Sequence, residues 1–273
     1  MLKLSIKDIV NKIKKEEKFS CIALDSSFYI AIEDYVPFVC AAIHNGNNLR
    51  RELKRKIALS DFERWYEEDP LTGEFISSMP IRIIANDSRY EYDLNRSPEK
   101  CIYEEAWGKK VWKFPLSQEE RRKSLKKYYQ FYRVIDVLME KLLEKFGKCI
   151  VYDIHSYNYK RIKGDTPLFN IGVEKIDTKK FGKIIENWYS QLSKIKISGI
   201  ENRVAINEVF KGRGYFLEYI TMKYDVLVLA TEIKKIYCDE NTGEIYQNIV
   251  KELKEGLEKS IIKNVEFFLK NIK

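Results

Sequence analysis

The pattern of apolar and polar positions predicts helices and strands in alternation along most of the chain. Apolar residues recur at helical spacing in five segments, at residues 5–16, 60–68, 117–146, 178–194 and 246–270, and a charged stretch predicts a further helix at 49–56. Shorter extended runs predict strands at 20–24, 38–43, 81–84, 89–95, 149–155, 203–206 and 226–231. This alternation is typical of a mixed sheet with helices on both faces. We therefore expect one three-layer α/β/α domain over residues 1–273.

Several predicted helices carry recognisable end signals. Ser5 is a candidate N-cap, and Ser60 with Glu63 three residues later forms a capping-box pattern. The longest predicted helix follows Ser117 and ends at about Phe146, where Gly147 suits a C-cap. These signals define the helix boundaries more sharply than the apolar spacing does.

Composition narrows the class of protein. Hydrophobic residues make up 45% and charged residues 33% of the 273 residues, and no window approaches the roughly 18 uninterrupted apolar residues that a membrane span needs. The N-terminus lacks the apolar core of a signal peptide, and the five cysteines are scattered without paired spacing, which predicts a reduced, cytoplasmic protein. The net charge is +8, but the lysines are dispersed, so we expect no nucleic-acid partner. The oligomeric state stays open.

The only two histidines of the sequence, His44 and His155, each end an apolar run that predicts a strand. Ligands of α/β proteins gather outside the carboxyl ends of the strands, so two histidines there could converge on one metal ion. On position alone, packing roles are an equally good interpretation. Other reactive side chains also lie at or just after the ends of predicted strands, which favours a functional site: Asn95, Arg96, Asn207 and Glu232.

A hydrolytic zinc site needs a third ligand, commonly a carboxylate, and leaves one position for water. The run Glu67-Glu68-Asp69, just before Pro70, offers three adjacent candidates. The alternative interpretation is an exposed acidic turn, which is the more common fate of such a run.

The stretch from Arg89 to Arg96 alternates polar and apolar residues, which would place one polar set on a single face of a strand: Arg89, Glu91, Asp93 and Asn95. A buried polar face predicts internal pairing, either Arg89 with Asp93 or Arg89 with Glu91. The functional alternative is a clamp for a substrate carboxylate, because the guanidinium fork matches a carboxylate.

Glu232 ends the apolar run that begins after Asp225, and a carboxylate delivered there could move a proton during hydrolysis. The alternative interpretation is that Glu232 has a structural role and forms a salt bridge with Lys234 or Lys235. Gly212 and Gly214 flank Arg213 and by themselves indicate only a tight turn.

Taken in order, these motifs resemble the N-formylglutamate amidohydrolase family over roughly residues 37 to 240. The resemblance rests on Ile43-His44-Asn-Gly, Glu67-Glu-Asp69-Pro, Ser88-Arg-Tyr-Glu-Tyr-Asp93-Leu-Asn95-Arg96, Asp153-Ile-His155-Ser, Asn207-Glu-Val-Phe-Lys-Gly212 and Thr231-Glu232-Ile-Lys-Lys-Ile-Tyr237. It implies a fold related to that of zinc-dependent carboxypeptidases and aminoacylases, with zinc at the sheet edge.

The resemblance also implies a role for each site residue. His44, His155 and Asp69 would bind zinc, with Glu68 as the alternative third ligand. Arg89 would polarise the scissile carbonyl, and Glu232 would act as general base and then general acid. The substrate's carboxylate would be held by Asn95 and Arg96, and Asn207 is counted with the substrate-binding residues.

The expected function is therefore zinc-dependent cleavage of the amide bond in an N-acyl amino acid such as N-formyl-L-glutamate, a small substrate bearing a carboxylate. A second hypothesis is a carboxypeptidase-like hydrolase that acts on a peptide C-terminus. A third, from another class, is a binding or regulatory module that keeps the fold without catalysis. Buried polar groups at a lapsed site would be costly, which argues against the third.

Overall fold

The structure, a computed structural model, describes residues 1–272. Its helices are α1 Ile6–Lys14, α2 Arg51–Lys54, α3 Asp61–Glu67, α4 Thr72–Phe75, α5 Gln118–Phe146, α6 Thr178–Leu192, α7 Tyr215–Tyr224 and α8 Gln247–Asn271. Its strands are β1 Lys3–Leu4, β2 Phe19–Ala23, β3 Phe28–Ile32, β4 Phe38–Ala42, β5 Ile81–Ala85, β6 Glu105–Ala106, β7 Lys109–Lys110, β8 Ile150–Tyr157, β9 Phe169–Gly172, β10 Val204–Ile206 and β11 Leu227–Lys234.

Nine of the strands form one mixed sheet in the order β1-β2-β3-β5-β4-β8-β11-β9-β10, and β6 pairs with β7 in a separate hairpin. The four neighbours β5, β4, β8 and β11 run parallel to one another. Their carboxyl ends therefore meet at one edge of the sheet, which is where α/β folds place ligands.

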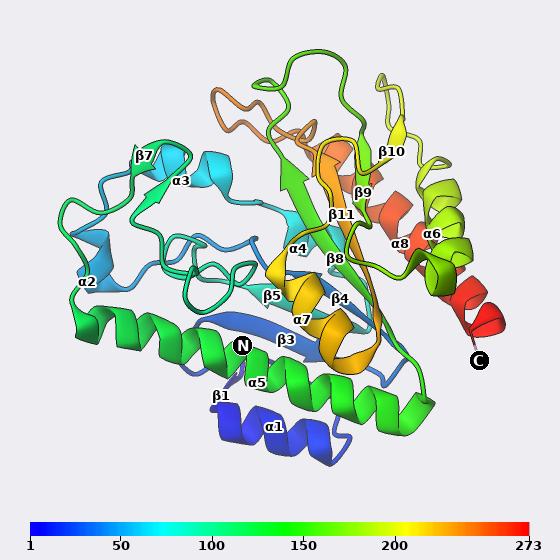
Figure 1. Ribbon diagram of the computed structural model, residues 1–273, viewed down its shortest axis with the longest axis horizontal. Coiled ribbons are helices and arrows are strands. Elements are labelled where there is room, and N and C mark those ends of the chain that lie inside the picture. Colours follow the sequence, from blue (N-terminus) through cyan, green and yellow to red (C-terminus); the bar gives the residue numbers. More distant parts are fainter. Residues whose placement is uncertain (273) are drawn as a thin grey trace.

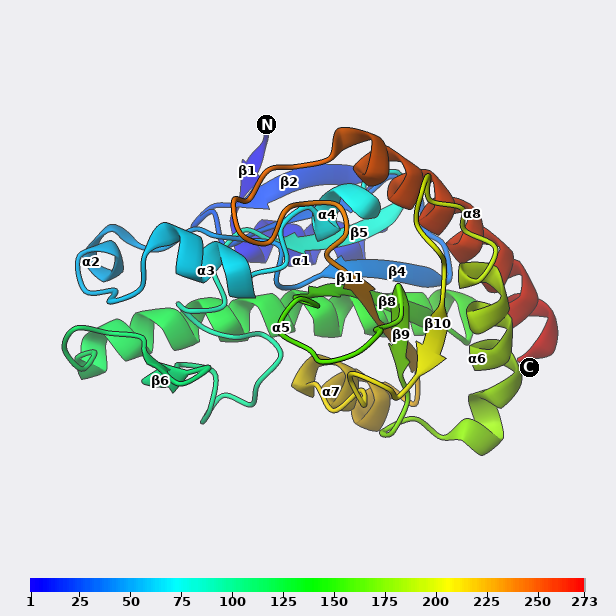
Figure 2. The same cartoon turned by 90° about the horizontal axis from the view of Figure 1, so that it is seen from above.

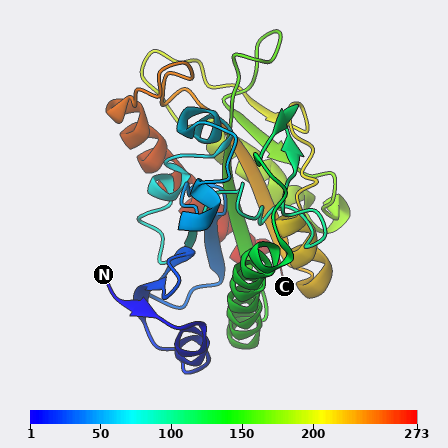
Figure 3. The same ribbon diagram turned by 90° about the vertical axis from the view of Figure 1, so that its left-hand side faces the viewer.

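Helices cover both faces of this sheet, as the expected α/β/α architecture requires (Figure 1). Figures 2 and 3 show α5 and α7 on one face and α4 and α8 on the other. Helix α6 packs on α8, and α1 packs on α5. The main apolar core fills the space between these layers. A smaller apolar cluster lies under the segments around α2 and the β6–β7 hairpin, and it includes Leu53, Tyr90 and Trp112.

The predicted helix ends are confirmed. The Ser5 hydroxyl accepts a hydrogen bond from the Asp8 N–H at the start of α1, and Ser60 and Glu63 form the reciprocal capping box of α3. Helix α5 begins after Ser117 with a second capping box and ends at Gly147, whose φ of 70° is the left-handed conformation that glycine adopts readily.

One predicted strand is wrong. Residues 89–95 form turns, because local hydrogen bonds replace a strand ladder: the Glu91 N–H donates to the Ser88 carbonyl, and the Asn95 N–H donates to the Asp93 side chain. The helix predicted at 49–56 is only the single turn α2. Strands β3 and β9 and helix α7 were not predicted, since short buried runs carry little periodicity.

All five cysteines are buried and free of disulfide bonds, in agreement with their scattered spacing. Across residues 1–272, no helix combines the length and apolar character needed to cross a membrane.

Candidate metal and active site

His44 follows β4 by two residues and is buried at the sheet edge. Its Nε2 lies 2.8 Å from Asp93 Oδ1, and its Nδ1 lies 3.5 Å from Asp69 Oδ2. Nε2 thus faces Asp93, which we call an outer carboxylate, while Nδ1 faces Asp69. When Nε2–H donates a hydrogen bond to this carboxylate, the neutral imidazole keeps its proton on Nε2 and the Nδ1 lone pair is free to bind a metal.

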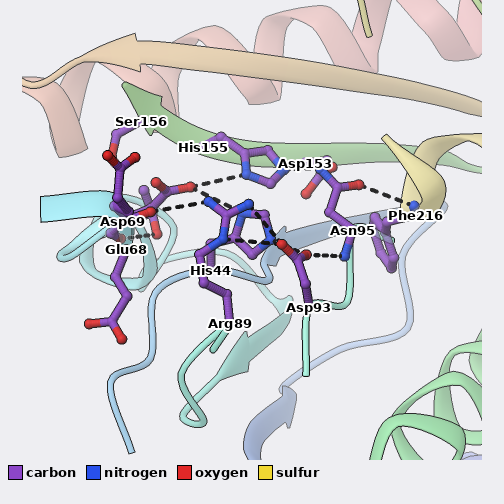
Figure 4. A network of polar contacts seen from close by, with 12 residues as sticks. His44, Glu68, Asp69, Arg89, Asp93, Asn95, Asp153, His155, Ser156 and Phe216 are labelled. Carbon is purple, nitrogen blue, oxygen red and sulfur yellow. Dashed lines mark hydrogen bonds and ion pairs between the residues drawn. The ribbon is translucent and has the colours of Figure 1, made fainter. Parts of the chain in front are cut away.

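His155 repeats this arrangement from the neighbouring strand β8. Its Nε2 lies 2.9 Å from Asp153 Oδ2, and its Nδ1 lies 3.1 Å from Asp69 Oδ2. Residues 153 and 155 share one face of the strand because side chains alternate along it. Both histidines therefore turn Nδ1 toward the same carboxylate oxygen (Figure 4).

Asp69 is the third member of a buried group with His44 and His155, whose ligand atoms all lie within 4.8 Å of one another. A tetrahedral zinc ion about 2.1 Å from its ligands separates them by roughly 3.4 Å, close to the two Nδ1–Oδ2 distances. Three lone-pair-bearing atoms this close repel unless a cation or proton lies between them. Burial alone would raise the pKa of Asp69, but hydrogen bonds with both histidines outweigh it and lower that pKa. The donor set therefore fits a metal ion.

Glu68, the alternative third ligand, is buried but turned away from this group. Its Oε1 accepts a hydrogen bond of 2.5 Å from the Ser88 hydroxyl and lies 3.5 Å from Arg64 Nη1. Burial raises the pKa of Glu68 to about 7. The interpretation of Glu67-Glu68-Asp69 as an exposed turn is thus wrong for its last two residues, which are 1% and 3% exposed.

Arg89 lies at the edge of the cavity and is held from two sides. Its Nε and Nη2 lie 3.1 and 2.8 Å from Asp93 Oδ2, so the expected Arg89–Asp93 pairing is confirmed. Its Nη1 donates to the Glu67 carbonyl at 3.1 Å, and its guanidinium lies 4.9 Å from the ring of Trp107. Such a clamped, stacked guanidinium has few ways to move.

Asp93 is a fully buried carboxylate that connects several parts of the site. It contacts His44 and Arg89, accepts a hydrogen bond from the Tyr103 hydroxyl, and accepts another of 2.7 Å from the Asn95 N–H. Burial opposes its ionisation, but the charge of Arg89 and the contact with His44 hold its pKa well below the ordinary value.

Asn95 and Arg96 also line the cavity. Two tyrosines of α5 hold their backbone: the Tyr132 hydroxyl donates to the Leu94 carbonyl at 2.5 Å, and the Tyr128 hydroxyl donates to the Arg96 carbonyl at 2.9 Å. The Arg96 side chain is exposed and makes no ion pair within residues 1–272. Among the described residues it therefore has no counter-charge at the cavity.

Glu232 lies on β11 directly opposite His155 of β8 in the parallel register, and it lines the same cavity. Burial raises its pKa to about 8, with His155 opposing the rise and the charges of Asp69 and Asp153 adding to it. The alternative of a salt bridge is wrong: Lys234 and Lys235 donate to backbone carbonyls instead.

The cavity has a volume of about 320 Å³, enough for a small molecule. Besides Arg89 and Arg96, three further basic residues line it: Arg161, Lys211 and Arg213. Arg161 is paired with Glu67 at 2.6 Å and Arg213 with Glu174 at 2.7 Å, so much of their charge is already compensated. No pattern in the sequence predicts any of the three as a cavity residue.

Asn207 is placed differently from the other predicted substrate-binding residues. Its Oδ1 accepts a hydrogen bond of 2.8 Å from the Val173 N–H, and its backbone is left-handed with φ 55°. This side chain therefore fixes a turn beside β9. The glycines that follow have a packing role as well: a Cβ on Gly214 would meet the Asn95 side chain at 2.2 Å.

The outer carboxylates are the residues that the sequence analysis missed as partners of the histidines. Asp153 was recoverable, because an Asp-x-His spacing on a strand puts both side chains on one face. Asp93 was not recoverable, because it lies 49 residues from His44. The strand wrongly predicted at 89–95 also suggested only Arg89 as its partner.

Comparison with known proteins agrees with this geometry. A family profile described as N-formylglutamate amidohydrolase matches residues 36–237. The crystal structure of an N-formylglutamate amidohydrolase from Ralstonia eutropha JMP134 is similar, with a TM-score of 0.72 at 18% identity, covering 88% of this chain and 97% of that one. A gene product of Agrobacterium tumefaciens has a TM-score of 0.62 at 17% identity, covering 87% and 95%. No curated protein sequence matches the chain.

Proposed function

Because the chain belongs to the N-formylglutamate amidohydrolase family, we propose that it is a zinc-dependent hydrolase that cleaves the amide bond of an N-acyl amino acid such as N-formyl-L-glutamate. The observation that carries the proposal is the convergence of His44 Nδ1, His155 Nδ1 and Asp69 Oδ2 inside a cavity that also holds Glu232 and Arg89. Family membership supports amide hydrolysis. The dependence on zinc and the identity of the substrate are part of the proposal.

His44, His155 and Asp69 would hold the ion. Zinc in such a site supplies Lewis acidity, which polarises a carbonyl and eases the ionisation of water. Asp93 and Asp153 would keep both imidazoles in the tautomer whose Nδ1 lone pair points inward. Side chains would carry out the other steps, which are proton transfer, stabilisation of negative charge and substrate binding.

Glu232 is the proposed general base. It would take a proton from the attacking water and then give it to the departing amine, so that one carboxyl group serves both steps. Its pKa of about 8 without a metal keeps it protonated at neutral pH. A divalent cation nearby would lower that pKa and bring it toward the pH at which a base works best.

Arg89 is the proposed stabiliser of negative charge on the carbonyl oxygen. Asp93 and the Glu67 carbonyl fix its orientation before substrate arrives, so little reorganisation is needed when charge develops. Arg96, which lacks an ion-pair partner among the described residues, would bind the substrate's carboxylate with Asn95 beside it. Asn207 is left out of this proposal because, unlike Asn95, it does not line the cavity, and its Oδ1 accepts a hydrogen bond from the Val173 N–H.

The decisive experiment combines metal analysis with a substrate panel. We expect about one zinc ion per purified chain, loss of that zinc in His155→Ala, and retention of zinc with turnover reduced by orders of magnitude in Glu232→Gln. The panel compares N-formyl-L-glutamate, other N-acyl amino acids and short peptides. Protein without stoichiometric zinc would refute the metal assignment, and activity confined to peptides would favour a carboxypeptidase-like enzyme.

A further inference from the structure

The backbone around Asp69 is held by side chains from elsewhere in the fold. Consecutive carbonyls from Tyr66 to Pro70 each accept a side-chain hydrogen bond, at distances of 2.6 to 3.1 Å, from Asn158, Lys235, Arg89, Thr72 and Tyr237. Carbonyls at a helix C-terminus lack partners within the helix, and α3 ends at Glu67. The position of Asp69 therefore depends on these donors.

Lys235 makes two of these contacts. Its Nζ donates to the Tyr66 carbonyl and to the Glu68 carbonyl, both at 2.7 Å, and so bridges the backbone on either side of Glu67. The residue is 1% exposed, and its ammonium also lies 5.8 Å from the ring of Trp65. A buried lysine is uncommon and costly unless its charge is well solvated by protein groups. Both hydrogen-bond acceptors of this ammonium, and the Trp65 and Tyr66 rings beside it, belong to the segment that leads to Asp69.

Lys235 is anchored to the same strand as Glu232. It directly follows β11, and its own N–H donates to the Tyr157 carbonyl at the end of β8. Asn158, which directly follows β8, donates to the same Tyr66 carbonyl at 2.6 Å. The two strands that carry His155 and Glu232 therefore also provide the donors that tie down the segment bearing the third ligand.

We propose that Lys235 is a positioning residue of the metal site. By fixing the carbonyls of Tyr66 and Glu68, it holds Asp69 Oδ2 at the point where the Nδ1 atoms of both histidines converge. This inference rests on the proposed function, since it requires that Asp69 bind the ion.

The test is zinc affinity, measured by competition with a chromophoric chelator, in Lys235→Met. Methionine keeps the apolar stem and removes the ammonium, and we expect a loss of about tenfold or more, the size typical when a group that orients a ligand is removed. Hydrogen exchange of the metal-free protein should become faster in peptides covering residues 64–72. Two matched controls should keep wild-type affinity. They are Lys234→Met, at the neighbouring residue that ends β11, and Tyr152→Phe, which removes a buried 2.7 Å hydrogen bond to Asn264 away from the site.

The possible results distinguish a failure of this inference from a failure of the proposed function. Wild-type zinc affinity in Lys235→Met overturns the inference, as does an equal loss in Tyr152→Phe, which would indicate a general effect of stability. If Lys235→Met does not fold, Lys235→Gln replaces it, because the shorter amide is not expected to bridge both carbonyls, and the same criteria apply. Wild-type protein that binds no zinc refutes the proposed function itself and this inference with it. Zinc-binding wild type with an unaffected variant refutes the inference alone.

Discussion

The imidazole of His44 and the carboxylate of Asp93 form a buried pair, with Nε2 and Oδ1 2.8 Å apart. The pair joins the edge of the central sheet to an irregular segment 49 residues later in the chain. Asp93 also contacts Arg89 and the Asn95 backbone. A proposed metal ligand, a proposed oxyanion group and the proposed substrate-binding residues are thus organised by one carboxylate.

Replacing Asp93 should accordingly weaken metal binding without removing a ligand. Asp93→Asn keeps the shape of the side chain but loses the charge that sets the His44 tautomer, so we expect zinc affinity to fall by about 10- to 100-fold. A competition titration measures this fall. Asp136→Asn serves as the control, since Asp136 accepts hydrogen bonds from Tyr219 and Tyr224 away from the histidines. Equal zinc affinity in Asp93→Asn and wild type would contradict the prediction.

Arg96 should act on substrate binding more than on chemistry. Arg96→Ala is expected to raise KM for an N-acyl amino acid by about 10- to 100-fold, the effect of losing a hydrogen bond to a charged group, with a smaller change in kcat. The same variant should handle the corresponding carboxamide substrate as poorly as wild type does. Arg203→Ala, which removes a half-buried arginine paired with Asp165 and Glu208 outside the cavity, is the control. A similar KM in both variants would remove Arg96 from the proposal.

Tyr132 should stabilise the loop that carries Asn95. Tyr132→Phe leaves the buried Leu94 carbonyl without its 2.5 Å donor, and we expect a loss of about 1 to 3 kcal/mol in the free energy of unfolding. Urea denaturation measures it. Tyr129→Phe on the same helix is the control, because Tyr129 is 55% exposed. Equal stability of the two variants would show that this hydrogen bond contributes little.

Glu232 should make the stability of the metal-free protein depend on pH. Its folded-state pKa of about 8 lies above the ordinary value of 4.5, so the folded state favours the protonated carboxyl. This contribution is fully present below about pH 4.5 and is lost as the pH rises through 8. Relative to Glu232→Gln, chelator-treated wild type should therefore lose stability between pH 5 and pH 9, as measured by urea denaturation at each pH. A constant difference between the two proteins would contradict this assignment.

The parts of the fold that the sequence predicts well are those with local signals. Capping residues define α1, α3 and α5, and the apolar runs before His44 and His155 define β4 and β8. Segment 89–95 shows the limit of such signals, because tertiary partners decide whether an alternating pattern forms a strand. Here the Tyr132 hydroxyl donates to the Leu94 carbonyl, and the Asp93 N–H donates to the Cys101 carbonyl.

The residues of the candidate site likewise differ in whether a local sequence signal predicts them. His44, His155 and Glu232 were identifiable because each ends an apolar run in the sequence, although His155 and Glu232 lie two residues inside their strands. The sequence offers Lys235 only as one of two alternative salt-bridge partners of Glu232. The three-dimensional structure reveals its contacts with Tyr66 and Glu68, which lie 167 or more residues away. Contacts at such separation leave no trace in local spacing.

The pairing of His155 with Glu232 across β8 and β11 has a mechanical consequence. Neighbouring parallel strands sit about 4.8 Å apart on a continuous backbone ladder, so a proposed ligand and the proposed base cannot shift relative to each other without breaking the centre of the sheet. Asp69 and Arg89, in contrast, lie on connecting segments. One side of the candidate site is thus fixed by the backbone of the sheet, and the other is fixed by hydrogen bonds from side chains such as Lys235 and Asp93. Substitution of those side chains could therefore move the second side while the sheet stays intact.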